Sequence, residues 1–190
     1  MKVNIIENTP TSVSFKLSGV GFNFANALRR IMMNSIECFA IDTVTFYENS
    51  SAMFDEYIAH RIGLIPILTP KGYTKKDEIL FKLSVEGPMT VYSKEIISSD
   101  KDVRVANENI PLMKLAQGQK LRFDATAILS TGAKSSKFQP GLATYSANEK
   151  GDEFEFYVET FGQIPAMEII TRALDIISNN VKEISKELKK

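Results

Sequence analysis

The chain has 190 residues, of which 44% are hydrophobic and 24% charged, the usual balance of a globular protein, and its 23 basic and 23 acidic residues leave no formal net charge. A protein whose main task is to bind nucleic acid usually has more basic than acidic residues, so the zero net charge argues against a primary nucleic-acid-binding function. The single cysteine, Cys38, excludes an internal disulfide and a cysteine-based metal site. The sequence has neither the pattern of a signal peptide nor an apolar run of about 18 residues, which predicts a cytoplasmic protein without a membrane span.

The first 35 residues predict a β-hairpin followed by an amphipathic helix. Apolar residues alternate on both sides of a turn at 8–11, as in two antiparallel strands. Asn23 is a suitable N-cap for a helix that continues to about Ser35. The apolar stripe of this helix is formed by Phe24, Leu28 and Ile31. Away from the centre of the stripe lie three polar residues, Asn26, Arg29 and Arg30.

The middle of the chain predicts mostly strands. Residues 41–48 have the pattern of a strand, and a short helix over 54–62 is followed by Gly63, a favoured C-cap residue. Two further strands are predicted over 79–86 and 89–96, joined by a glycine–proline turn. Another strand is predicted over 121–129, and a hairpin over 141–160.

The clearest signal is a long amphipathic helix at the C-terminus. Pro165 suits a first helical position, and Glu168 lies in the first turn, where an acidic group interacts favourably with the helix dipole. Apolar residues recur three and four positions apart in a heptad seam, formed by Met167, Ile170, Leu174, Ile177, Val181, Ile184 and Leu188. A second apolar row accompanies only the first half of the helix and contains Ala166, Ile169, Ala173 and Ile176.

This helix is too long to be covered by one small sheet. The seam extends for about 33 Å at the standard rise per residue, whereas a typical strand covers about 17–20 Å. The first half can therefore lie on the sheet while the second half overhangs, and exposed Ile, Val and Leu side chains would promote aggregation. We therefore expect the two long helices to bind a partner protein.

No group of residues in the sequence has the pattern of a catalytic site. His60 is the only histidine, and a lone histidine on a short helix is usually structural. Cys38 lies in an apolar setting that favours an inert, buried thiol. The sequence contains neither a phosphate-binding glycine loop nor an aspartate cluster for two magnesium ions. We therefore expect no catalytic residues, no metal and no cofactor.

Four segments, in order along nearly the whole chain, resemble the alpha-like subunits of cellular RNA polymerases, in particular the archaeal members. The NALRRI stretch at 26–31 resembles the first helix of that family, and EYIAHRIGLIPI at 56–67 resembles the signature of its archaeal and eukaryotic members. Residues 118–140 are similar to a strand and loop of the family's insertion domain. Residues 154–174 are similar to its closing strand and dimerisation helix, and the combination is highly specific.

The resemblance implies an α+β fold in which a dimerisation domain consists of an antiparallel sheet and two long helices. This domain would be discontinuous, because a mostly β insertion domain interrupts it. The dimerisation domain would comprise 1–40 and 150–190, and the insertion domain 41–149. The chain would be a non-catalytic assembly subunit of a DNA-directed RNA polymerase. It would form a heterodimer with subunit L, dock the second-largest catalytic subunit and the small N- and P-type subunits, and meet DNA only indirectly through the complex.

The resemblance also implies roles for particular residues. Subunit L would contact apolar side chains of the two helices, namely Phe24, Leu28, Ile31, Ile170, Leu174, Ile177, Val181 and Ile184. The large subunit would contact polar side chains, where a guanidinium can clamp a carboxylate, namely Asn26, Arg29, Arg30, His60 and Arg61. Because Cys38 is the only cysteine, we expect the minimal form of the family, without the iron–sulfur or zinc site that some relatives carry.

Two other functions stay open from the sequence. The chain could act as a symmetric homodimeric scaffold, as bacterial alpha subunits do before they meet the large subunits. It could also be a nucleic-acid-binding module that uses two basic loops, Lys71–Lys76 and Lys134–Lys137, each of which contains or adjoins an aromatic residue. An independent enzyme is the least favourable interpretation.

Overall fold

The computed structural model describes residues 1–189. They fold as two compact units, one formed by Met1–Glu37 with Thr131–Lys190 and the other by Cys38–Ser130. We call these the first unit and the second unit. Both contain antiparallel sheets with helices, which confirms the α+β class with a mostly β segment inserted between the two parts of the first unit.

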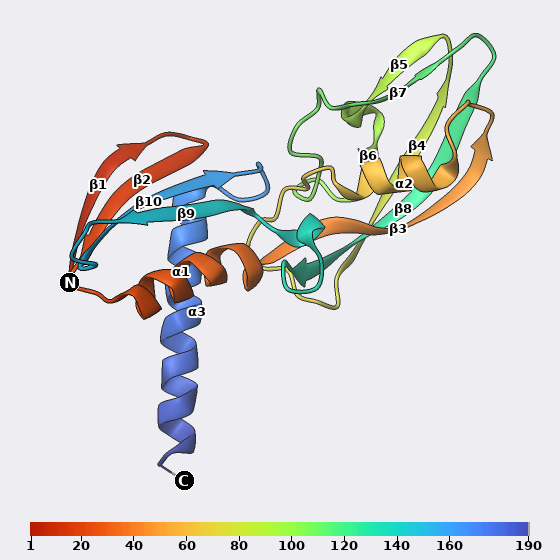
Figure 1. The fold of residues 1–190 in the computed structure, drawn as a ribbon. Helices are drawn as coiled ribbons and strands as arrows, with labels where there is room; N and C mark the ends of the chain where they lie inside the picture. Colours follow the sequence, from red (N-terminus) through yellow and green to blue (C-terminus); the bar gives the residue numbers. More distant parts are fainter. Residues whose placement is uncertain (190) are drawn as a thin grey trace. The chain divides into compact units, whose positions relative to one another are not determined.

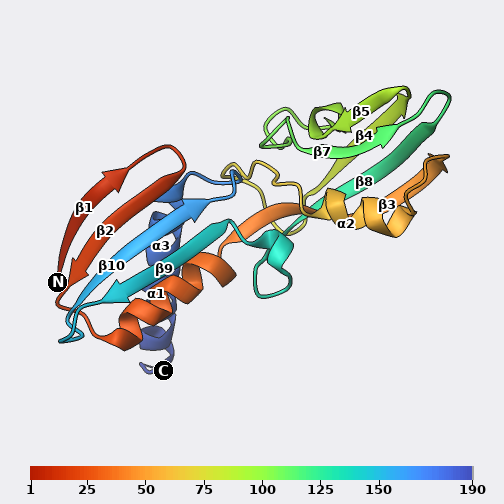
Figure 2. The same cartoon turned by 45° about the horizontal axis from the view of Figure 1, so that its top comes forward.

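The first unit is a four-stranded antiparallel sheet with two helices on one face. The strand order is β1-β2-β10-β9, which brings the N-terminal hairpin beside the hairpin near the C-terminus (Figures 1 and 2). Its elements are β1 (Lys2–Asn8), β2 (Ser12–Ser18), α1 (Phe22–Asn34), β9 (Gly141–Ala147), β10 (Glu153–Thr160) and α3 (Ala166–Glu187), with a 3-10 turn η2 (Ser136–Phe138) before β9.

Alternation along the strands builds the core of the first unit. Val13, Phe15 and Leu17 of β2 are buried and pair across the ladder with the equally buried Val158, Phe156 and Phe154 of β10. The rings of Phe15 and Phe156 stack with their centroids 5.0 Å apart. The two helices cover this apolar face, with α1 beside β9 and α3 beside β2 and β10.

The second unit closes around its own hydrophobic core. Its main sheet has the order β3-β8-β4-β6, and a separate two-stranded sheet pairs β5 with β7. The elements are β3 (Glu37–Asn49), α2 (Asp55–Gly63), β4 (Glu78–Glu86), β5 (Met89–Tyr92), η1 (Ser93–Glu95), β6 (Ile97–Ser98), β7 (Pro111–Leu115) and β8 (Lys120–Thr131). Phe39, Phe81 and Phe123 are fully buried at the centre of this core.

The structure differs from the sequence-based expectation in the helix ends. The N-cap of α1 is Gly21 and not Asn23, because the carbonyl of Gly21 accepts the backbone N–H groups of Phe24 and Ala25 at 3.1 and 3.2 Å. Gly63 is the last residue of α2 and not its C-cap, which is Leu64.

The borders of the units also differ from the expected ones at 40/41 and 149/150. Residues 131–149 belong to the first unit, because β9 pairs with β10 along its whole length, from Gly141 opposite Thr160 to Ala147 opposite Phe154. The sequence pattern already predicted that 141–160 forms one hairpin. Because β9 and β10 are the two strands of this hairpin, both belong to the same sheet and therefore to the first unit.

Candidate partner-binding surface

The two apolar rows of α3 have different surroundings. The row that contains Ala166, Ile169 and Ala173 is buried against the first unit. On the heptad seam next to this row, Ile170 is 9% exposed, whereas Met167 before it and Leu174 after it are 36% and 44% exposed. The first half of α3 thus anchors the helix, and the seam is only partly covered by the chain itself.

The second half of α3 overhangs the rest of the first unit. Every described residue from Ser178 onwards is exposed, and Figure 1 shows this part of the helix extending away from the sheet. Val181 and Ile184, both on the seam, are each 61% exposed. The exposure of these β-branched side chains at heptad spacing leaves a continuous apolar strip open to a partner.

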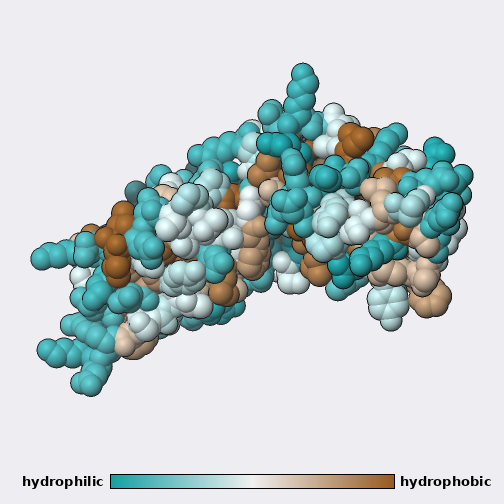
Figure 3. Space-filling model, turned by 90° about the horizontal axis from the view of Figure 1, so that it is seen from above, coloured by the Kyte–Doolittle hydropathy of each residue, from teal (hydrophilic) through white to brown (hydrophobic). Residues whose placement is uncertain are grey.

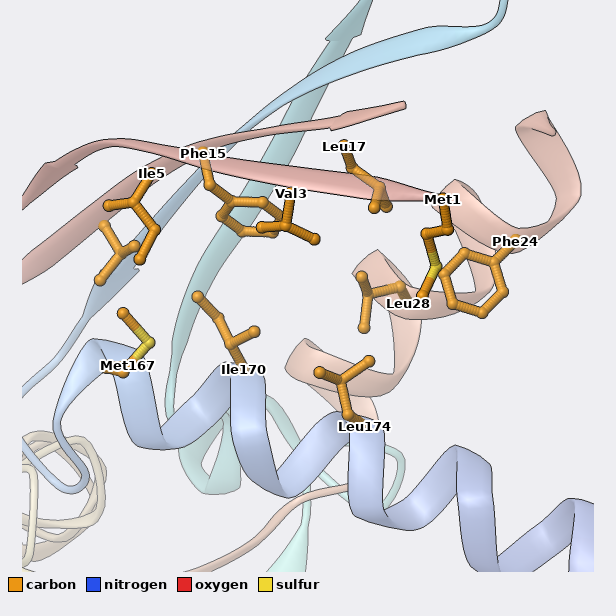
Figure 4. A pocket seen from close by; sticks show the side chains of 11 residues that line it. Met1, Val3, Ile5, Phe15, Leu17, Phe24, Leu28, Met167, Ile170 and Leu174 are labelled. Atoms are coloured by element: carbon orange, nitrogen blue, oxygen red, sulfur yellow. The ribbon is translucent and has the colours of Figure 1, made fainter. Parts of the chain in front are cut away.

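An apolar groove lies beside the seam in the first unit. It has a volume of about 140 Å³ and lies between the inner face of the β1–β2 hairpin and the helices α1 and α3 (Figure 4). The side chains that line it are all apolar: Met1, Val3, Ile5, Val13, Phe15, Leu17, Phe24, Leu28, Met167, Ile170 and Leu174. Its shape and lining fit apolar side chains of another polypeptide and offer no polar group that would orient a small ligand.

Strand β1 forms an open edge of this groove. All seven of its residues are exposed, including Val3 (60%) and Ile5 (53%), whose side chains point toward α3 in Figure 4. The strand is held in the sheet by its ladder with β2, in the register Val3–Leu17 and Ile5–Phe15. Its apolar side chains therefore lie at the surface in an ordered arrangement.

Four of the eight residues expected to face subunit L line the groove, and three more continue the seam. Phe24, Leu28, Ile170 and Leu174 lie on the groove, and the seam continues over Ile177, Val181 and Ile184. Ile31 lies elsewhere, in a shallow depression with polar residues of α1. The groove is also lined by Met1, Val3 and Ile5, which the sequence-based expectation did not name. For Val3 and Ile5 the reason is that alternation along a strand shows one face but not whether the chain covers it.

The polar residues expected to meet the large subunit lie in both units. Asn26, Arg29 and Arg30 are on α1, where Arg29 Nη2 donates a hydrogen bond to Asn26 Oδ1 at 3.1 Å. His60 and Arg61 are on α2 in the second unit, and Arg61 Nη2 donates to the carbonyl of Pro111 at 2.7 Å. The structure therefore does not bring these five residues together within one unit.

Among residues 1–189, no cluster of three or more His, Cys, Asp or Glu side chains could hold a metal ion, and no helix is long and apolar enough to cross a membrane. Backbone N–H groups of Val103 and Asp102 lower the pKa of Asp100 in a loop of the second unit. In the basic loop before β9, Lys134 and Lys137 lie over the ring of Phe138, at 5.5 and 5.2 Å from its centroid.

Each of the two units has exposed apolar side chains of its own. In the space-filling view of Figure 3, hydrophobic residues reach the surface in small patches among hydrophilic ones. In the first unit the exposed apolar side chains include those of β1 and α3, and in the second unit they include those at the two ends of α2. Single exposed apolar residues are normal, but ordered groups of them indicate contact with another protein.

Comparison with known proteins gives this surface a family context. Residues 14–181 match the family model described as the RNA polymerase Rpb3/Rpb11 dimerisation domain. The chain is 45% identical over 152 residues to DNA-directed RNA polymerase subunit Rpo3 of Thermococcus kodakarensis, an alignment that covers 76% of this chain and 59% of that protein. It is 44% identical over 166 residues to Rpo3 of Methanocaldococcus jannaschii, which covers 87% of this chain and 85% of that protein.

Relatives differ in length. The chain spans less than two thirds of the Thermococcus protein and of the Rpo3 subunit of Pyrococcus furiosus, of which the alignment covers 58% at 45% identity. The match to the family model nevertheless covers the whole second unit and extends into both parts of the first unit, over residues 14–37 and 131–181. The chain belongs to the RNA polymerase Rpb3/Rpb11 dimerisation-domain family.

Proposed function

We propose that the chain is a non-catalytic assembly subunit of a DNA-directed RNA polymerase and that it forms a heterodimer with subunit L through the groove and the exposed seam of α3. The observation that carries this proposal is the exposure of Val181 and Ile184 on a helix whose first half is anchored by a buried apolar row. An isolated soluble chain has no physical reason to display an ordered heptad seam to water.

The geometry of the groove supports a helix or strand of the partner as its occupant. Val3 and Ile5 on one side and Leu174 on the other are partly exposed, so they would lose further solvent contact if a partner lay between them. Each apolar Å² removed from water contributes about 25 cal/mol. With the overhang of α3 included, the interface would be of the obligate class, roughly 2,000 Å² or more.

The polar residues of α1 and α2 would then be available for other polymerase subunits. Asn26, Arg29 and Arg30 in the first unit and His60 and Arg61 in the second would contact the second-largest catalytic subunit. The small N- and P-type subunits would dock on the same heterodimer. The catalytic groups would come from the large subunits, and DNA would be met only through the assembled complex.

Co-expression with subunit L tests the proposal directly. The two chains should elute together in size-exclusion chromatography, with a light-scattering mass equal to the sum of one copy of each. Ile184→Asp should weaken the complex by more than about 100-fold, because an unpaired carboxylate in an apolar interface costs about 3 kcal/mol or more. Asn179→Asp adds the same charge to an exposed position of α3 outside the seam and should leave binding nearly unchanged.

A symmetric homodimer is the second candidate, because one chain carries both an apolar groove and an overhanging apolar helix. Light scattering of the chain alone and with an excess of subunit L distinguishes the two. A homodimer that persists in excess subunit L would overturn the heterodimer, whereas a dimer that converts to the 1:1 complex would support it.

A further inference from the structure

The groove of the first unit contains two methionines, Met1 and Met167, which differ chemically from the rest of its lining. Their sulfur atoms are the only atoms besides carbon and hydrogen in the side chains that line the groove, because all the others are hydrocarbons. In Figure 4 the two side chains lie at opposite ends of the groove, Met167 at the start of α3 and Met1 beyond Leu28. We call Met1 and Met167 the groove methionines.

The groove methionines are also the most accessible methionines of the chain. The sequence has seven methionines, all of which lie within residues 1–189. Met1 and Met167 are 81% and 36% exposed, whereas Met32 and Met113 are 1% and 7% exposed and the others are partly buried. An oxidant dissolved in water must reach the sulfur atom in order to react with it. Oxidation of the folded free chain should therefore begin in the groove.

Hydrogen peroxide converts a methionine thioether into a sulfoxide. The sulfur lone pair attacks one peroxide oxygen, the O–O bond breaks as the S–O bond forms, and the other oxygen takes up a proton and leaves as water. The sulfur is thereby oxidised by two electrons and the peroxide is reduced. A thiol-dependent reductase reverses the change, because two thiols are oxidised to a disulfide while the sulfoxide oxygen is released as water. The modification is therefore reversible.

A sulfoxide in this groove would find no hydrogen-bond donor among the lining side chains, since none of them carries an N–H or O–H group. In the free chain, water can solvate the new oxygen because Met1 and Met167 are exposed. An apolar partner that entered the groove would displace this water and bury a polar oxygen without a partner, which opposes binding. Oxidation would thus affect association far more than the fold of the free chain.

We propose that the groove methionines form a peroxide-sensitive modification site, at which sulfoxide formation prevents the free chain from binding subunit L. Subunit L, once bound, shields the same sulfur atoms, so only the unassembled chain is sensitive. This rests on the proposed function, since it takes subunit L to occupy the groove. Met167 should have the larger effect, because its backbone is fixed in the first turn of α3 beside the buried Ala166, whereas Met1 lies outside the ladder of β1 with β2.

Treatment of the free chain with hydrogen peroxide, followed by a binding titration with subunit L, tests the site. Peptide mass spectrometry should find the groove methionines oxidised before Met32 and Met113, while circular dichroism stays unchanged. The affinity for subunit L should then fall at least about tenfold. In the complex formed before treatment, the groove methionines should be oxidised much more slowly than in the free chain. Equal rates of oxidation in the free chain and in the complex would overturn the proposal.

Leucine variants assign the effect to particular sulfur atoms. Met1→Leu with Met167→Leu removes both sulfurs of the groove, in a chain released from an N-terminal fusion so that position 1 can be changed. Its affinity for subunit L, compared with its own value before treatment, should not respond to peroxide. Met53→Leu with Met89→Leu removes two partly buried methionines of the second unit and is the matched control, which should lose affinity after treatment as the unaltered chain does.

Reduction of the oxidised chain gives a test that needs no variant. Treatment with a methionine sulfoxide reductase and a dithiol should restore the binding of subunit L as the sulfoxides disappear from the mass spectrum. If subunit L fails to bind the untreated chain, the proposed function is wrong. If it binds the untreated and the oxidised chain equally well, or if removal of the sulfoxides does not restore binding, only the modification site is wrong.

Discussion

The two halves of α3 carry the same heptad seam but differ in what surrounds them. In the first half, the neighbouring row of Ala166, Ile169 and Ala173 is buried, and Ile170 on the seam is nearly so. In the second half no companion row exists, and Val181 and Ile184 are exposed. The difference shows that one continuous pattern serves two tasks, since the first half contributes to the stability of the chain and the second half is available for a partner.

The largest expected effect comes from a charge placed in the first half. Ala173→Asp would bury an unpaired carboxylate at a fully buried position and should destabilise the first unit by about 4 kcal/mol or more. Chemical denaturation monitored by circular dichroism measures it. A variant that unfolds at the same denaturant concentration as the unaltered chain would show that the first half of α3 does not anchor the helix.

The corresponding change in the groove should affect binding but not folding. Val3→Asp places a charge on an exposed groove side chain, so the free chain should keep its stability to within about 0.5 kcal/mol. The affinity for subunit L should fall roughly 30- to 100-fold, because the carboxylate would be buried in the complex. Ile6→Asp is the matched control on the same strand, at an exposed residue that does not line the groove, and titration calorimetry should show a much smaller loss.

The smallest expected effect concerns Asp100, in the second unit, which should influence stability at low pH but not partner binding. The pKa of Asp100 is lowered in the folded chain, first by the backbone N–H of Val103 and then by that of Asp102, at 3.0 and 2.8 Å. A carboxyl group whose pKa is lowered by folding stabilises the folded state at pH values above its ordinary pKa, which is 3.8. This contribution is lost as the pH falls below that value.

Asp100→Asn should therefore reduce the loss of stability of the second unit between pH 5 and pH 3. Thermal unfolding at a series of pH values measures the change, and binding of subunit L at pH 7 should remain as in the unaltered chain. A weakened complex at pH 7 would mean that the two units depend on each other more strongly than their separate cores indicate.

Much of the secondary structure follows from local patterns. The alternation in β2 and β10 and the heptads of α3 place apolar side chains on one face, and these elements are present where they were predicted. Helix ends were less predictable, because at Gly21 the backbone carbonyl caps α1 without any side-chain bond. The borders of the first unit were displaced for another reason, since pairing of β9 with β10 and not composition assigns 141–147 to its sheet.

What the sequence by itself determined is the periodicity, the lack of cysteine pairs and the family motifs, all of which are local or compositional properties. What only the tertiary structure decided is which apolar residues the chain covers. Val3 and Val13 both belong to alternating strands, yet Val3 is 60% exposed and Val13 is fully buried, because β2 lies between two other strands and under the helices while β1 is the edge of the sheet. Exposure depends on neighbours distant in sequence, so the open groove and the overhang of α3 become visible only when the chain is folded.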